Sequence, residues 1–225
     1  SRRRLYRQQA QYQVSRAALT AGLQIAAGVL GLGAIALAGA QAIGFSIAIA
    51  WFLWQTLRID WRHADAMVDA VTRCGAVPML DFATMPAALA SPAGSSGMPR
   101  DPALWARFVQ AVVRRYNGEQ KRQIRYFELG NEPNAGGCPL ADWLRMYETF
   151  ARAVTEADPS ALPGGPAAAA FGREWLAALA DACAARKIPL GFLSWHGYNQ
   201  APARYLTQVR EARGILGAHP ELKGA

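Results

Sequence analysis

Residues 127–134, with the sequence FELGNEPN, place an amide and a carboxylic acid directly after a short hydrophobic run. Pro133 stops this run, because proline lacks the N–H group that the interior of a strand or helix requires. A strand over residues 124–130, followed at once by Asn131 and Glu132, is therefore expected. Polar side chains at a strand end, rather than within the strand, are typical of functional sites in proteins with parallel strands.

Apolar strands alternate with amphipathic helices on both sides of this segment, which predicts one domain with a parallel sheet and right-handed helical crossovers. Apolar residues recur at helical spacing from His63 to Cys74, and Asp101 with Pro102 has the residue types that begin a helix. Helices are predicted over residues 63–74, 101–118, 139–157, 172–187 and 202–216, and strands over 76–82, 124–130, 160–170 and 190–198.

Two architectures contain such a sheet, an open nucleotide-binding sheet and a closed barrel. The open sheet needs a glycine-rich turn after its first strand, and GVLGLG at residues 28–33 lacks both the GxGxxG context and an acidic residue about 20 positions on. The sequence therefore favours an α/β fold of the (β/α)8 TIM barrel type, incomplete, with about six β/α units. In that fold functional groups lie where strands end, as Asn131, Glu132, His196 and Tyr198 do here.

The first quarter of the chain leaves two alternatives open. Residues 1–16 form a basic tail, and residues 17–57 contain no charged residue. The apolar stretch at 19–40 has the length of a bilayer-spanning helix, roughly 20 residues, and arginines precede it. A membrane anchor within residues 17–43 would make the protein extracytoplasmic or membrane-anchored. The same uncharged segment equally fits the first β/α unit followed by the second strand.

The amino-acid composition argues against several classes of protein. The net charge is +8, but only 18% of the residues are charged and 52% are hydrophobic, as expected for a folded domain rather than a disordered chain. The arginines are scattered outside the tail and no nucleic-acid-binding motif occurs, so no nucleic-acid partner is predicted. The three cysteines and three histidines lie far apart, so neither a metal site nor a disulfide-based scaffold is expected.

Glu132 and Asn131 suit the cleavage of a glycosidic bond. A carboxyl group at the shielded rim of a barrel can hold a proton near neutral pH and donate it to a leaving oxygen. The adjacent amide can hydrogen-bond a substrate hydroxyl and so position the sugar. The alternative is an ordinary solvated loop carboxylate, and the apolar strand in front of Glu132 favours the functional interpretation.

Three segments resemble glycoside hydrolase clan A, and family 39 in particular. YFELGNEPN (residues 126–134) is similar to the strand-4 signature of the clan, FLSWHGYN (192–199) to strand 6 of family 39, and residues 59–82 to its helix-2 and strand-3 region. The similarity covers about residues 41–225. It implies a partial TIM barrel that acts on an oligo- or polysaccharide, in a group of β-xylosidases, α-L-iduronidases and bacterial exopolysaccharide hydrolases.

The resemblance also implies roles for individual residues. Glu132 would be the catalytic acid/base of a retaining O-glycosyl hydrolase, and Asn131 the partner of a sugar 2-hydroxyl. His196 and Tyr198 would line the site, and Trp195 would either stack against a sugar or, equally, pack inside the barrel wall. Trp54 matches a tryptophan that follows strand 2 in the group, and core packing explains this residue equally well. Two carboxylates suffice for the mechanism, so no cofactor and no metal is implied.

The sequence departs from the family pattern at two points. Retaining hydrolysis needs a second carboxylate about 5 Å from the first; in the family it ends strand 7, and Glu221 precedes any such strand. The second strand has Ile49 and Trp51 where the group has Arg and Asp. The chain is therefore expected to be truncated before strand 7 and to lack hydrolase activity by itself. A non-catalytic carbohydrate-binding or interaction module derived from a clan A glycosidase is the alternative function.

Overall fold

The computed structural model describes residues 61–91, 97–198 and 200–222. The chain divides into two compact units, Ser1–Ala64 and Asp65–Ala225. The second unit is described below, together with the first turn of the helix that leads into it. The predictions for the basic tail, for the uncharged segment at 17–57 and for Trp54 lie outside the described residues.

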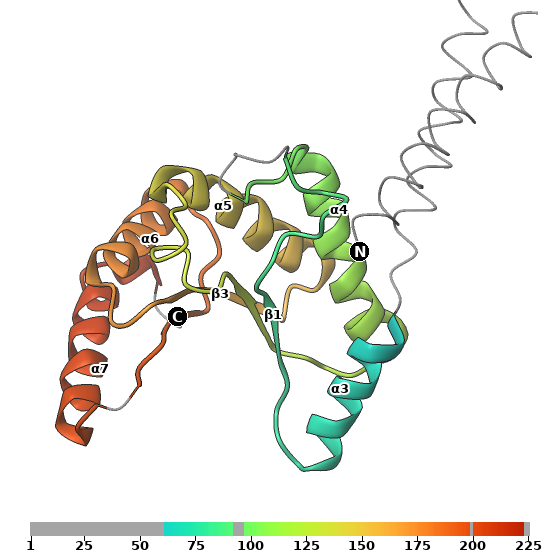
Figure 1. Cartoon of the computed structure of the whole chain (residues 1–225), viewed down its shortest axis with the longest axis horizontal. Coiled ribbons are helices and arrows are strands. Elements are labelled where there is room, and N and C mark those ends of the chain that lie inside the picture. The colour runs from blue at the N-terminus through green and yellow to red at the C-terminus, as the bar shows by residue number, and fades with distance from the viewer. Residues whose placement is uncertain (1–60, 92–96, 199, 223–225) are drawn as a thin grey trace, which may run out of the picture. The chain divides into compact units, whose positions relative to one another are not determined.

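A four-stranded parallel sheet forms the centre of the second unit (Figure 1). Its strands lie side by side in the order in which they occur in the sequence, as successive strands of a barrel wall do. They are β1 (Met79–Phe82), β2 (Tyr126–Leu129), β3 (Leu162–Ala168) and β4 (Phe192–Trp195). All four were predicted. All four are shorter than predicted, since pairing with the neighbouring strand extends over only a few residues.

A helix follows each strand, so that the chain repeats one strand–helix unit four times after the first helix. The helices are α3 (Trp61–Arg73), α4 (Pro102–Val113), α5 (Leu140–Ala157), α6 (Arg173–Arg186) and α7 (Pro202–Gly217), with a π-helical turn at Arg114–Glu119 and a 3₁₀ turn at Pro220–Leu222. This confirms the α/β class with a parallel sheet. The prediction of about six units extends into residues outside the described ones and stays a prediction.

The start of α4 shows how local chemistry sets an element boundary. The Asp101 carboxylate accepts hydrogen bonds from the backbone N–H groups of Ala103 (2.8 Å) and Leu104 (3.2 Å), and Pro102 occupies the first helical position. This is the cap predicted from the sequence. The predicted end at residue 118 was approximate, because the α-helix stops at Val113 and continues as the π-helical turn.

The two faces of the sheet differ, because side chains alternate along each strand. Phe82 and Phe127 face the helices, and Phe82 contacts Phe150 with a centroid separation of 5.2 Å. On the other face, Asp81 and Glu128 are register partners on neighbouring strands. The helix side is therefore the hydrophobic core, and the opposite face carries acidic groups.

Glycine allows close ring contact on the acidic face. Tyr126 and Phe192 meet edge to face at 5.8 Å across β3. A Cβ atom at Gly164, between them, would lie 2.5 Å from the Phe192 ring. A larger residue at this position would push the ring away, so the absence of a side chain at 164 is a packing requirement.

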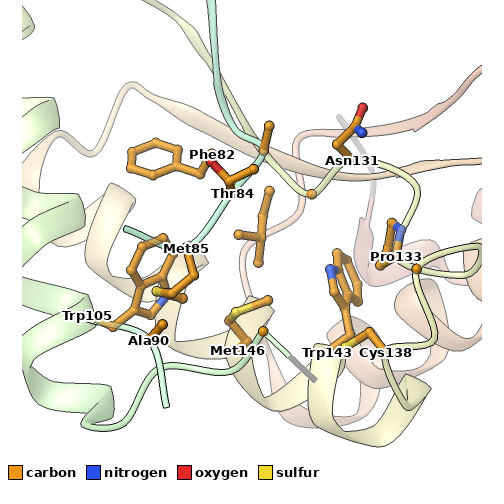
Figure 2. A pocket seen from close by; sticks show the side chains of 15 residues that line it. Phe82, Thr84, Met85, Ala90, Trp105, Asn131, Pro133, Cys138, Trp143 and Met146 are labelled. Carbon is orange, nitrogen blue, oxygen red and sulfur yellow. The ribbon is translucent and has the colours of Figure 1, made fainter. Parts of the chain in front are cut away.

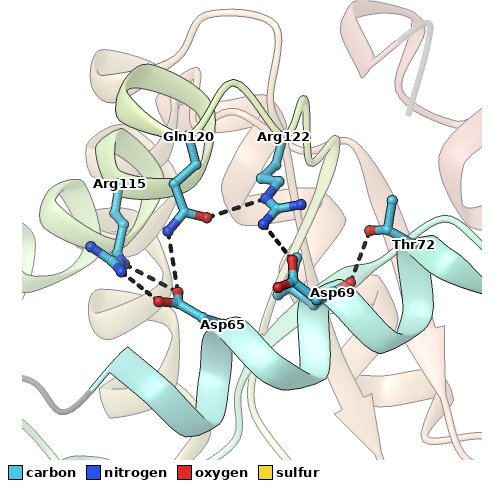
Figure 3. A network of polar contacts seen from close by, with 7 residues as sticks. Asp65, Asp69, Thr72, Arg115, Gln120 and Arg122 are labelled. Atoms are coloured by element: carbon cyan, nitrogen blue, oxygen red, sulfur yellow. Dashed lines mark hydrogen bonds and ion pairs between the residues drawn. The ribbon is translucent and has the colours of Figure 1, made fainter.

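Ion pairs attach α3 to the segment that follows α4 (Figure 3). Arg115 binds the Asp65 carboxylate through two nitrogens, at 3.2 and 2.5 Å, and Gln120 donates to the same carboxylate at 3.3 Å. Arg122 pairs with Asp69 one helical turn further along. The Arg115 guanidinium is the main reason why the pKa of Asp65 lies below its usual value.

The structure tests two further predictions in part: the membrane anchor and the state of the cysteines. Within residues 61–222, as far as they are described, none of the helices combines the length and the apolar character needed to cross a bilayer. The predicted anchor at 17–43 lies outside this range. Cys74, Cys138 and Cys183 are all free thiols, exposed, half-buried and buried respectively.

Candidate functional site

Glu132 follows β2 and is held in place through its backbone. It has a φ of +52°, in the left-handed region that residues other than glycine rarely occupy. Its N–H group donates to the Ala167 carbonyl oxygen on β3 at 2.9 Å, and its own carbonyl oxygen accepts from Ala135 (3.0 Å) and Gly136 (2.9 Å). Unfavourable φ values of this kind persist where surrounding contacts impose them, and they are frequent at functional sites.

His196 follows β4 and reaches the same point from the other side of β3. Its N–H group donates to the Ala168 carbonyl oxygen at 2.8 Å. Its Nδ1 atom lies 2.7 Å from Oε1 of Glu132, and both side chains are about one-third exposed, 28% for His196 and 35% for Glu132. The structure therefore brings the two predicted site residues into direct contact, although 64 residues separate them in the chain.

Asn134 continues the pairing of β2 with β3 beyond the end of β2. Its side-chain oxygen accepts from the Ala169 N–H at 2.8 Å, and its amide nitrogen donates to the Ala169 carbonyl at 3.2 Å. The side chain thus substitutes for a backbone strand partner. Asn134 was quoted with the strand-end motif but had no predicted role; an asparagine one residue after a strand-breaking proline is the signal that could have indicated one.

Gly130 is required by the close approach of the two strand ends. It has a φ of +116°, and a Cβ atom there would lie 2.7 Å from the Pro166 carbonyl oxygen and 3.4 Å from Nε1 of Trp143. Only glycine accommodates both the backbone conformation and this approach. It ends β2 and turns the chain so that Asn131 and Glu132 lie at the rim.

The remaining predicted residues lie at different distances from this pair. The Tyr198 ring is 6.0 Å from the His196 ring, at an angle of 65°, and 72% of its surface is exposed. Asn131 is exposed and lies at the edge of a neighbouring cavity, where Figure 2 shows its amide directed away from the cavity centre. Trp195 packs in the core on the helix side of the sheet, 5.2 Å from Phe171, and does not line the site.

Two further carboxyl groups on the same face of the sheet were missed by the sequence analysis. Glu128 is 6% exposed, and Asp81 is its register partner on β1. The pKa of Asp81 is raised to about 7, first by desolvation and then by the Glu128 charge, while His196 opposes the rise. The Asp81 side chain is nevertheless exposed to solvent on one side. An acidic residue inside an otherwise apolar strand was the signal.

The geometry at the two strand ends suits proton transfer. A carboxyl group hydrogen-bonded to an imidazole at the rim of a parallel sheet can be oriented to donate and accept a proton. In the part of the chain that the structure describes, no three His, Cys, Asp or Glu side chains are grouped so that they could hold a metal ion.

Comparisons with known proteins identify a glycosidase family and relatives that match part of the chain. The profile of Glycosyl hydrolases family 39 matches residues 53–212. A β-xylosidase of Geobacillus stearothermophilus is 33% identical over 159 residues, which are 64% of this chain and 31% of that protein. A second β-xylosidase, from Caldicellulosiruptor saccharolyticus, is 28% identical over 159 residues, 63% of this chain and 32% of that protein. The chain thus spans about a third of the length of these curated relatives.

Solved structures show the same partial match. The GH39 enzyme from Xanthomonas axonopodis pv. citri superposes with a TM-score of 0.59 and 26% identity, over 72% of this chain and 37% of that one. A monomeric β-xylosidase from Caulobacter crescentus CB15 gives a TM-score of 0.60 at 22% identity, over 72% and 38% of the two chains, which supports the fold alone. The sheet described here therefore matches part of a TIM-barrel enzyme.

Replacement of Asn134 tests whether its side chain stabilises the strand ends. Asn134→Ala removes two hydrogen bonds and is expected to lower the free energy of unfolding by about 1–3 kcal/mol, measured by urea denaturation. Asn131→Ala, in an exposed amide of the same loop, is the matched control and should change it by less than about 0.5 kcal/mol. Equal effects of the two substitutions would contradict the role given to Asn134.

Replacement of Asp81 tests the acidic face through its pH dependence. The folded-state pKa of Asp81, about 7, lies above its ordinary value of 3.8. Between these pH values the folded chain keeps a proton that the unfolded chain has released, so Asp81 makes stability fall as pH rises to about 7, with no further change above. Asp81→Asn cannot ionise. Its stability relative to the parent should therefore rise between pH 4.5 and 8 in unfolding experiments, and parallel pH profiles would count against the shift.

Proposed function

Because the chain belongs to glycosyl hydrolase family 39, we propose that it carries the acid/base part of a retaining glycosidase site, with Glu132 as the acid/base. The observation that supports this most directly is the 2.7 Å contact between the Glu132 carboxyl group and His196 at adjoining strand ends. A proton donor that must meet a glycosidic oxygen has to be held in one orientation, and this contact, with the backbone bonds of Glu132, supplies it.

The proposed mechanism uses Glu132 twice. As an acid it donates its proton to the glycosidic oxygen as the bond to the sugar breaks, and as a base it then accepts a proton from the water that releases the sugar from the enzyme. His196 acts through Glu132, because its ring forms a hydrogen bond with the carboxyl oxygen Oε1 and so restrains the rotation of the carboxyl group. We assign His196 as a positioning residue on these grounds.

Asn131 and Tyr198 are proposed to contact the substrate directly. Asn131 is exposed beside Glu132 and has the donor and acceptor that a sugar hydroxyl needs. Tyr198 presents an exposed ring next to His196, and such a surface suits the face of a sugar. The retaining reaction also needs a nucleophilic carboxylate about 5 Å from the acid. Asp81 and Glu128 lie within strands rather than beyond strand ends, so we do not assign them this role.

The proposed substrate class is the β-xylosides, because two relatives at 33% and 28% identity are β-xylosidases. Carbohydrate as the partner follows from family membership. Aryl β-xylosides are the first substrates to try, since they separate the role of the acid from sugar binding: a leaving group that is already acidic does not need protonation.

Substitution of Glu132 in an active enzyme that contains this chain tests this assignment. Glu132→Gln should lower kcat/KM by about 10²–10⁴-fold for an alkyl or phenyl β-xyloside. The loss should be much smaller for a dinitrophenyl β-xyloside. Glu221→Gln, an exposed carboxylate on the 3₁₀ turn, is the control and should leave both rates unchanged. Equal losses with both leaving groups would show that Glu132 is not the proton donor.

The 225-residue chain by itself is expected to bind xylosides without hydrolysing them, because neither Asp81 nor Glu128 is assigned as the nucleophile. Turnover by this chain that disappears in Glu132→Gln would show that the second carboxylate lies within it. If the complete protein also binds without turnover, the alternative applies: a carbohydrate-binding module derived from a glycosidase.

A further inference from the structure

A cavity of about 430 Å³ lies beside the proposed acid, on the helix side of the sheet (Figure 2). It lies between the loops that follow β1 and β2 and the helices α4 and α5. Its walls are mainly apolar and include Phe82, Met85, Trp105, Leu129, Trp143 and Met146. Glu132 and His196 are not among the residues that line it. The size is in the range of small-molecule sites, roughly 300–1,000 Å³.

Two unpaired hydrogen-bond donors belong to the wall of this cavity. Trp105 and Trp143 are each 1% exposed, and the indole nitrogen Nε1 of each has no hydrogen-bond partner among the described residues. Figure 2 shows the nitrogen of Trp143 directed toward the cavity centre and that of Trp105 toward Met85 and Ala90. A buried donor without a partner lowers stability, because it has lost its hydrogen bond to water and gained none. Two such donors at one cavity therefore indicate an acceptor that would bind there.

Trp195 provides the internal comparison. Its indole is half-buried, and the N–H group donates to Oε1 of Gln208 at 3.1 Å, so it needs no further partner. The chain therefore satisfies this half-buried indole N–H with a side-chain amide. At the cavity two such donors lie against mainly apolar walls, and none of the residues described by the structure supplies an acceptor to either.

The lining restricts the chemistry of a ligand. None of the described residues that line the cavity carries a charge, which argues against an ion. A monosaccharide would bring a hydroxyl on nearly every carbon into walls that offer few partners. We propose that this cavity binds an uncharged, mainly aromatic or aliphatic molecule whose acceptor oxygen pairs with the indole N–H groups of Trp105 and Trp143. This cavity shares Asn131 with the proposed glycosidase site, but it does not include Glu132 or His196 and its ligand takes no part in the proposed hydrolysis.

The cavity wall can adapt to such a ligand. Met85 and Met146 both line it, and methionine side chains have several rotatable bonds and pack adaptably. Movement of Met85 would open the approach to the Trp105 nitrogen that it faces in Figure 2. The aromatic walls of Phe82 and Trp105, whose rings lie 5.8 Å apart, would contact the apolar part of the ligand.

The indole N–H signals of the whole chain in a proton–nitrogen NMR spectrum test the proposal. Acetophenone is the probe, because it is uncharged, aromatic and carries only an acceptor. It should move the signal of Trp143, Trp105 or both downfield in a saturable manner, with the signals assigned from Trp105→Phe and Trp143→Phe. The signal of Trp195 should stay in place, because that donor already has a partner.

Cumene, which has nearly the same shape but no acceptor, is the matched control. It should displace acetophenone and reverse the downfield shift without causing one itself. Ala90→Leu, which adds bulk beside the Trp105 nitrogen, should weaken acetophenone binding at least tenfold, provided that its thermal unfolding midpoint matches that of the parent. If the midpoint of Ala90→Leu differs from that of the parent, the comparison of acetophenone with cumene still tests the proposal.

Three results would overturn the proposal. The first is no saturable shift of either indole signal up to the solubility limit of acetophenone. The second is an equal shift of the Trp195 signal, which would mean non-specific contact. The third concerns the rate at which the two indole protons exchange with water. If acetophenone leaves this rate unchanged, the cavity holds water only. None of these results bears on Glu132, so a failure here leaves the proposed function standing.

Discussion

The arrangement of the site depends on two consecutive carbonyl groups at the end of β3. Ala167 accepts the N–H of Glu132 from one side, and Ala168 accepts the N–H of His196 from the other. Strands in a sheet are about 4.8 Å apart, so the two residues stand roughly 10 Å apart along the sheet. Both are long enough to reach across β3, whose end carries only the small side chains of alanine. The 2.7 Å contact between them follows from that geometry.

The same sheet keeps the acid chemistry and the apolar cavity on different faces. Alternation along β1 and β2 directs Phe82 and Leu129 to the helices, and Asp81 and Glu128 to the opposite face. On the acidic face, desolvation and then the Glu128 charge raise the pKa of Asp81, and the imidazole of His196 opposes the rise. The helix face holds the unpaired indoles of Trp105 and Trp143. The short sheet therefore has a polar face and an apolar cavity on its two sides. The loop after β2 contributes to both, because Asn131 lines the cavity and Glu132 contacts His196.

Most elements could be predicted because their signals are local. Alternating apolar patterns marked the strands and helices, and the Asp101 cap marked the start of α4 to the residue. The ends of β4 and α4 were less accurate, since tertiary pairing decides where a strand or helix stops. Asp81 and Asn134 were missed as site residues, because their significance depends on partners on other strands: Glu128 for one and Ala169 for the other.

The sequence alone determined the α/β class, the family resemblance and the position of Glu132 at a strand end, since these follow from residue order and periodicity. Only the tertiary structure decided that His196 contacts Glu132, that Tyr198 lies exposed beside it and that Trp195 is a core residue. The physical reason is that hydrogen bonds and burial join residues far apart in the chain. Their geometry is set by the spacing and twist of the sheet, which no local pattern records.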